Sequence, residues 1–379
     1  MPDSSEIDPK RLPELVDHLP RVDVLRGIAG RVQAYLVGGA IRDLLLGVDD
    51  GPDLDVAIEG EVDALSDMPG FEPEREGLFL TGRLELDGIK VDVARARAES
   101  YPQPGALPEV RPATIEEDLA RRDFTVNARA FPLAGDRTEL IDPHGGVDDL
   151  RAGHLRVLHE RSFVDDPTRA LRAARYAARL GFELEPGTAK LLERTDLSSV
   201  SDDRVQAELR RIAAEDDPGR ALRLIVDWGV MPALDPAAPD RVAEVARLGF
   251  ESPWSGWADR ELAVMLAITR PLPQIRELAA ATPERPSEIV RLAEPWDPAQ
   301  LLVARALGAE WLDRYVDEFR MVRLEITGED LIAAGIPEGP AIGHGLGAAL
   351  SGMLDGEISG REEELRIALA AARGEIPED

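Results

Sequence analysis

Residues 34–46 have the sequence AYLVGGAIRDLLL, in which two glycines separate an apolar run from a helical pattern. The stretch 34–37 is short and apolar, as expected of a buried strand. After the glycines, the apolar residues recur at helical spacing. Gly38 and Gly39 let the backbone approach a bound group closely, and the N-terminus of a helix favours an anion. The stretch predicts a strand, a turn and a helix that hold a phosphate, with Arg42 adding positive charge. A purely structural turn is the alternative.

The next strand-like stretch is DLDVAI, residues 53–58. Residues two apart on a strand point to the same face, so Asp53 and Asp55 project together. Neighbouring carboxylates repel one another unless a cation lies between them, and oxygen ligands suit Mg²⁺. Asp92, in the sequence VDV, is a third acid on a neighbouring strand. These acids predict a magnesium site for two-metal phosphoryl transfer, whereas a solvated strand edge is the alternative for an isolated pair.

Other elements of an α/β unit surround these two stretches. Residues 79–86 and 88–93 predict a hairpin around an Asp-Gly turn, and residues 114–119 begin with the Thr-x-x-Glu pattern of a helix cap. Residues 98–112 contain four prolines and a glycine, so we expect no regular element there. A loop of this length inside a compact unit is often functional.

Arginines beside acids recur in the next two motifs. Residues 121–128 read RRDFTVNA, where Arg121 and Arg122 with Asp123 can bind a triphosphate and a ribose hydroxyl, or can form an ion-pair network. Residues 163–175 read FVDDPTRALRAAR, in which the proline after an acid predicts a helix start. Arg172 and Arg175 then fall within one arc of that helix, a pattern that is usually only a solvated face.

One acid and one arginine of this last motif predict recognition of a base. Asp166 and Arg169 lie one helical turn apart, so an acceptor and a donor can reach the same ligand edge. Cytosine and adenine both present an amine donor next to a ring-nitrogen acceptor, whereas guanine and uracil present the reverse. The pair therefore predicts acceptance of C and A without a nucleic-acid template.

The composition and the hydrophobic periodicity of the chain change at about residue 150. Beyond it the sequence is rich in Ala, Leu and Arg with a helical period, and strand patterns disappear. We therefore predict an α+β fold class, with an α/β head over residues 1–150 and an all-helical remainder.

Composition limits the function classes. The 379 residues carry a net charge of −29 and include no cysteine, which excludes disulfides, thiolate zinc sites and thiol nucleophiles. The acidity disfavours a nucleic-acid partner because phosphate contacts need basic residues, yet residues 151–180 hold seven arginines against three acids. There is no signal-peptide pattern and no apolar run of membrane-spanning length, so we expect a soluble cytoplasmic protein.

Taken in this order, the motifs resemble the class II CCA-adding tRNA nucleotidyltransferase and poly(A) polymerase family, of the DNA-polymerase-β-like superfamily. The matching stretches are GGAIRD (38–43), DLD (53–55), RRDFT (121–125), DPHGGVDDL (142–150), DDPTR (165–169), DRVQAEL (203–209) and ITGEDL (326–331). The resemblance implies a nucleotidyltransferase head over residues 1–150, a base-reading helical neck over 151–225, and a helical body and tail over 226–379 that bind the tRNA acceptor end. It also implies addition of C, C and A, or part of that sequence, from CTP and ATP with release of pyrophosphate.

The resemblance also implies roles for single residues. Asp53 and Asp55 would hold Mg²⁺, with Asp92 as a further catalytic acid. Gly39, Arg42 and Arg122 would contact the triphosphate and sugar of the nucleotide, and Gly38 and Asp123 are further nucleotide-binding residues. Asp166 and Arg169 would read the base, with Arg172 and Arg175 supporting the nucleotide from the same helix.

Several specificities stay open at this stage. Residues 101–108 and 162–169 resemble the A-adding branch of the family. Among the activities that the sequence allows, full CCA addition and A-only addition rank equally, and poly(A) synthesis ranks third. The long segment 98–112 argues against CC-only addition, since CC-adding members are expected to lack a movable loop there. A catalytically inactive nucleotide- or RNA-binding regulator is the alternative from another class. The sequence leaves the oligomeric state open.

Overall fold

The computed structural model describes residues 7–48, 54–74, 81–86, 89–134 and 139–375. The chain divides into two compact units, Met1–Glu215 with Ala221–Pro232 and Asp216–Arg220 with Ala233–Asp379. The predicted head and most of the predicted neck lie in the first unit.

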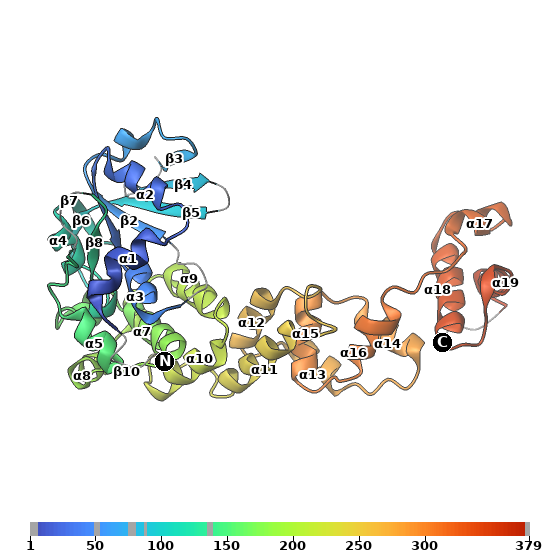
Figure 1. The fold of residues 1–379 in the computed structure, drawn as a ribbon. Helices are drawn as coiled ribbons and strands as arrows, with labels where there is room; N and C mark the ends of the chain where they lie inside the picture. Colours follow the sequence, from blue (N-terminus) through green and yellow to red (C-terminus); the bar gives the residue numbers. More distant parts are fainter. Residues whose placement is uncertain (1–6, 49–53, 75–80, 87–88, 135–138, 376–379) are drawn as a thin grey trace. The chain divides into compact units, whose positions relative to one another are not determined.

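A six-stranded mixed sheet forms the centre of the first unit (Figure 1). In spatial order its strands are β3 (Phe71–Glu74), β4 (Thr81–Leu86), β5 (Ile89–Arg95), β2 (Leu54–Glu59), β1 (Gln33–Val37) and β8 (Ala130–Pro132). β1 is antiparallel to both of its neighbours, and β4 is antiparallel to β3 and β5. β2 runs parallel to β5, which places Asp55 directly opposite Asp92.

The strand, turn and helix predicted around the two glycines are confirmed. β1 leads into α3 (Gly39–Leu46), which packs against it. Tyr35 and Val37 of β1 lie in a core with Leu119 of α4 (Ile115–Ala120). The predicted cap begins α4, where Thr114 and Glu117 exchange hydrogen bonds as a capping box. The predicted hairpin is β4–β5, and its turn at residues 87–88 lies outside the described residues.

The prediction of no regular element over residues 98–112 is wrong at both ends. β6 (Arg97–Ser100) and β7 (Glu109–Pro112) form a two-stranded antiparallel sheet. A two-stranded ribbon tolerates a proline at the end of a strand, because no further strand needs the missing N–H. The remaining prolines lie in the loop between the two strands, residues 101–108.

The expectation that strands disappear after residue 150 is also wrong in one place. β9 (His154–Leu155) and β10 (Glu183–Leu184) pair in parallel. Two residues are too short for a period-two pattern, so the sequence carries no signal for them.

Helices make up most of the rest of the described chain. In the first unit they are α1 (Leu12–Asp17), α2 (Val22–Ala29), α5 (Gly146–Ala152), α6 (Ser162–Asp165), α7 (Thr168–Leu180), α8 (Pro186–Leu192) and α9 (Asp202–Ala213). α10 (Pro218–Asp227) has residues in both units. In the second unit they are α11 (Ala238–Phe250), α12 (Arg260–Ile268), α13 (Pro273–Ala280), α14 (Pro286–Ala293), α15 (Pro298–Ala306), α16 (Leu312–Arg314), α17 (Gly328–Ala333), α18 (Pro340–Leu354) and α19 (Gly360–Ala372). None of the helices in the described ranges is long and apolar enough to cross a membrane.

α7 begins one residue after the predicted position, with Pro167 as its N-cap. Its small residues Ala170, Ala173 and Ala174 are fully buried. Two of its arginines, Arg169 and Arg175, are buried as well, so this charged stripe is not a solvated face.

Candidate active site

The glycine turn after β1 needs glycine at its first position. Gly38 has a φ of +69°, and a Cβ built there would lie 2.8 Å from Nη1 of Arg122. An L-residue with a side chain would meet both a strained backbone and this guanidinium. The turn therefore brings the start of α3 close to the arginines that follow α4.

Arg42, on the first turns of α3, is held by protein partners. Its guanidinium is 2% exposed, donates to both carboxylate oxygens of Asp43 at 2.8 and 2.9 Å, and donates to Oδ1 of Asn127 at 2.7 Å. It does not line the cavity described below. Arg42 is thus placed behind the glycine turn, where it adds positive charge without facing the cavity.

A second buried arginine lies near the same turn. The carbonyl of Arg129 accepts the N–H of Gly38 at 3.3 Å, and its side chain is fully buried. Burial lowers the pKa of Arg129 to about 10, so the group stays protonated at neutral pH. Arg129 was not among the predicted site residues, because nothing in the residues around it predicts the burial of an arginine.

Arg121 and Arg122 share one buried acid. Asp118 is 1% exposed, and its carboxylate accepts from Arg121 at 2.7 Å and from Arg122 at 3.0 Å. Burial opposes the charged form, but the two guanidinium groups hold the pKa of Asp118 below its usual range. The signal was present in the sequence, since the acid lies three and four residues before the arginines on one helical face.

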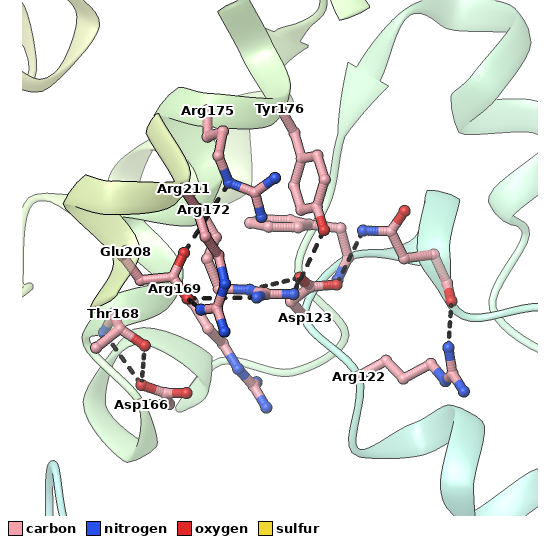
Figure 2. A network of polar contacts seen from close by, with 12 residues as sticks. Arg122, Asp123, Asp166, Thr168, Arg169, Arg172, Arg175, Tyr176, Glu208 and Arg211 are labelled. Carbon is pink, nitrogen blue, oxygen red and sulfur yellow. Dashed lines mark hydrogen bonds and ion pairs between the residues drawn. The ribbon is translucent and has the colours of Figure 1, made fainter. Parts of the chain in front are cut away.

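Asp123 connects the head to the neck helix. One of its oxygens accepts the Phe124 N–H at 2.8 Å and the Asn127 amide at 3.1 Å. The other accepts two N–H groups of Arg172, at 2.9 and 2.6 Å (Figure 2). Burial of both groups opposes their charge, yet each stabilises the other, so the pKa of Asp123 is lowered and the pKa of Arg172 is raised. Asp123 therefore holds Arg172 in place.

Asp166 and Arg169 are also fixed by neighbours. A single oxygen of Asp166 accepts from the Thr168 N–H and hydroxyl, at 3.1 and 2.6 Å, and from Arg204 at 2.8 Å. Arg169 is 4% exposed and donates to the Ser162 hydroxyl at 2.6 Å and to a backbone carbonyl at 2.7 Å. Arg204 belongs to the motif DRVQAEL (203–209) but was not among the predicted site residues.

Arg204, on α9, also contacts the loop between β6 and β7. It donates to the carbonyl of Gly105 at 2.7 Å, and the N–H of Gly105 donates to the Asp165 carbonyl at 3.3 Å. Gly105 has a φ of +70°, and a Cβ there would lie 2.4 Å from a backbone oxygen of Ser199. The loop is thus docked on the neck beside Asp166.

One cavity of about 460 Å³ lies between the glycine turn, the arginines that follow α4 and the start of α7. Eight of the predicted site residues line it: Gly38, Gly39, Asp55, Arg122, Asp123, Asp166, Arg169 and Arg172. The acid on the strand and the acid–arginine pair on the later helix therefore face the same space. Three predicted residues do not line it: Arg42, Arg175 and Asp92. Arg175 instead pairs with Glu215 at 3.3 Å.

Asp55 also lines a second cavity, of about 630 Å³, on the sheet. Asp92 faces this second cavity, where it is paired with Arg83 at 2.8 Å. Asp55 thus lies where two cavities meet. Asp53, the other predicted metal ligand, lies outside the described residues, and the described residues contain no group of three side chains suited to hold a metal ion. Two carboxylates in register on adjacent strands nevertheless have the donor chemistry that suits Mg²⁺.

Comparisons with known proteins agree with this geometry. The family model of the poly(A) polymerase head domain matches residues 34–156. The CC-adding tRNA nucleotidyltransferase of Deinococcus radiodurans is 36% identical over 373 residues, covering 94% of this chain and 93% of that protein. The A-adding tRNA nucleotidyltransferase of Geobacter sulfurreducens is 31% identical, covering 94% of this chain and 48% of that protein.

Solved structures extend the likeness to the fold. A CCA-adding enzyme in an apo form has a TM-score of 0.75 at 30% identity, with 97% of each chain covered. The Thermotoga maritima CCA-adding enzyme complexed with tRNA has a TM-score of 0.72 at 28% identity, covering 94% of this chain and 98% of that one.

Proposed function

The chain belongs to the CCA-adding tRNA nucleotidyltransferase family, and we propose that it adds nucleotides up to and including the terminal A to the 3′ end of tRNA, from CTP and ATP. One observation carries the proposal: Asp55, the glycine turn and the Asp166–Arg169 pair line a single cavity. The partners are supported by the relatives, which are named as tRNA nucleotidyltransferases, and by a solved neighbour complexed with tRNA.

In the proposed reaction, the terminal 3′-hydroxyl oxygen of the tRNA attacks the α-phosphorus of the nucleotide. A new P–O bond forms, the bond to the bridging β-phosphate oxygen breaks, pyrophosphate leaves, and the hydroxyl proton passes to solvent. Mg²⁺ held by Asp53 and Asp55 would supply the positive charge that favours ionisation of the hydroxyl and stabilises the leaving group. Asp92 is paired with Arg83 at 2.8 Å, an ion pair that would compete with any part Asp92 takes in holding the metal.

The protein's own cations support the triphosphate. Arg122 and Arg172 line the cavity with guanidinium groups that are oriented by Asp118 and Asp123. Orientation before binding matters because a long arginine side chain otherwise loses rotamer freedom when the ligand arrives.

Asp166 and Arg169 carry the proposed base selection. Three donors converge on one oxygen of Asp166, which fixes the direction of its carboxylate. An acceptor that cannot rotate favours the amine of cytosine or adenine over the carbonyl at the same place in uracil or guanine. The selection therefore follows from side chains and not from a template strand.

The loop at residues 101–108 favours addition of the terminal A, since we expect CC-adding members to lack it. The rival is CC-only addition, the activity named for the Deinococcus relative.

The test offers tRNA transcripts ending before CCA, after C and after CC, each with CTP, ATP or both. Extension of the CC-ended transcript by ATP supports the proposal, and extension of that transcript alone identifies an A-adding enzyme. Termination at CC in the presence of both nucleotides would contradict it, and absence of any extension would contradict transferase activity altogether.

A further inference from the structure

The aromatic ring of Tyr176 lies among three of the arginines predicted to bind the nucleotide, of which Arg172 lines the cavity. The ring centre is 4.5 Å from the guanidinium carbon of Arg175, 5.4 Å from that of Arg42 and 5.7 Å from that of Arg172. Figure 2 shows the ring beside the Arg172–Asp123 pair. The motifs and the reaction described above assign no role to this tyrosine.

The three arginines come from two separate elements. Arg42 belongs to α3, directly after the glycine turn, whereas Arg172 and Arg175 share α7 with the tyrosine itself. Phe124 of the head meets the tyrosine ring edge-on, with ring centres 6.0 Å apart. Tyr176 therefore links the neck helix α7, on which it lies, to Arg42 of α3 and to Phe124 of the head.

An aromatic ring is better suited than a carboxylate to hold arginines at this position. Guanidinium groups are attracted to the face of an aromatic ring by its quadrupole. A carboxylate would attract the same arginines but would add negative charge to the wall of a cavity meant for a triphosphate. Tyr176 borders that cavity, and its hydroxyl lies 3.4 Å from Nη2 of Arg172.

We propose that Tyr176 is a positioning residue: its ring packs between Arg42, which lies behind the glycine turn, and Arg172, which lines the cavity, and so fixes the neck helix relative to the glycine turn around one bound nucleotide. This inference rests on the proposed nucleotidyl transfer. It predicts that the ring governs nucleotide affinity and selectivity, whereas the hydroxyl contributes little because its contact with Arg172 is long.

The test compares Tyr176→Leu with Tyr176→Phe. We expect Tyr176→Leu to raise the KM for ATP and CTP about tenfold, equivalent to about 1.4 kcal/mol, and to weaken discrimination against UTP and GTP. Tyr176→Phe keeps the ring and should stay within about threefold of the unaltered protein for both quantities. Should Tyr176→Leu fail to fold, Tyr176→Met carries the same expectation.

Phe250→Leu is the matched control. It removes another ring that lies under a guanidinium, that of Arg260 at 4.2 Å, but in the second unit. We expect its nucleotide KM and selectivity to be unchanged.

Two outcomes would overturn the inference: a folded Tyr176→Leu protein with unaltered KM and selectivity, or a Tyr176→Phe protein as impaired as Tyr176→Leu. Equilibrium binding of ATP is measured on the same proteins without tRNA. This measurement tests the role of Tyr176 independently of whether the protein extends tRNA. Loss of ATP affinity in Tyr176→Leu would support the positioning role even if no tRNA were extended.

Discussion

Replacing Asp123 by asparagine removes one partner of a buried ion pair with little change in volume. Asp123 is 7% exposed and accepts from Arg172 at 2.9 and 2.6 Å. Breaking a buried pair from one side costs roughly 3–5 kcal/mol. We expect about 3 kcal/mol, the lower end of that range, because Arg172 is partly exposed and keeps Glu208 at 3.5 Å. For a unit of this size the melting temperature should fall by roughly 6–12 °C.

Thermal unfolding followed by circular dichroism measures this shift. The matched control is Asp148→Asn, because Asp148 also pairs with an arginine, at 3.3 Å, but its side chain is 87% exposed. An exposed pair contributes at most about 1 kcal/mol, so the control should melt within a few degrees of the unaltered protein. A melting temperature for Asp123→Asn as high as that of Asp148→Asn would refute the reasoning.

The same comparison has a pH dependence of known sign. Burial opposes the charge of Asp123, but Arg172 and Asn127 hold its pKa well below the usual range. A depressed carboxylate pKa contributes stability above the unfolded pKa of about 3.9, and this contribution is lost as the pH falls toward the folded pKa. The stability difference between the unaltered protein and Asp123→Asn should therefore be full from pH 5 to 7 and shrink below about pH 4. A difference that grew on acidification would contradict the assignment.

Three further predictions test the site by substitution. Asp53→Ala or Asp55→Ala should abolish transfer in the presence of Mg²⁺ with an unchanged melting temperature, and substantial turnover in both would remove the metal assignment. Asp166→Ala or Arg169→Ala should relax discrimination against UTP and GTP in incorporation assays, and unchanged selectivity in both would show that the base is read elsewhere. Gly38→Ala should lower stability by about 1–3 kcal/mol, because a φ of +69° with a ψ of −130° is a backbone region that residues with a side chain rarely adopt. It should also raise the nucleotide KM. Unaltered kinetics would show that the turn does not approach the ligand.

The local elements of the head could be predicted because each has a signal within a few residues. Two glycines after an apolar run predicted β1 and α3, and the pair Thr114 and Glu117 predicted the cap of α4. Because of the prolines in residues 98–112 we predicted no regular element there, yet strands form at both ends of the segment. A two-stranded ribbon accommodates a proline at the end of a strand.

The site was predicted in part. The sequence identified Asp55, Arg122, Asp123, Asp166, Arg169 and Arg172 among the charged residues that line the cavity. It missed Arg97, Glu99, Arg121 and Arg204, and it treated Arg42 and Arg175 as equal to Arg122 and Arg172. Only the structure shows that the first two lie outside the cavity lining and pair with Asp43 and Glu215.

Residue types and short spacings were enough to indicate a carboxylate on a strand, Asp55, a glycine turn, and an acid one turn before an arginine on a later helix. These features are local, because backbone geometry alone determines which neighbours share a face. The partners of each charge depend on tertiary packing: Asp123 meets Arg172, Arg42 meets Asn127, and Gly105 meets Arg204 across long stretches of chain. No periodicity encodes such contacts, since they arise where buried charges must find compensation once the core has formed.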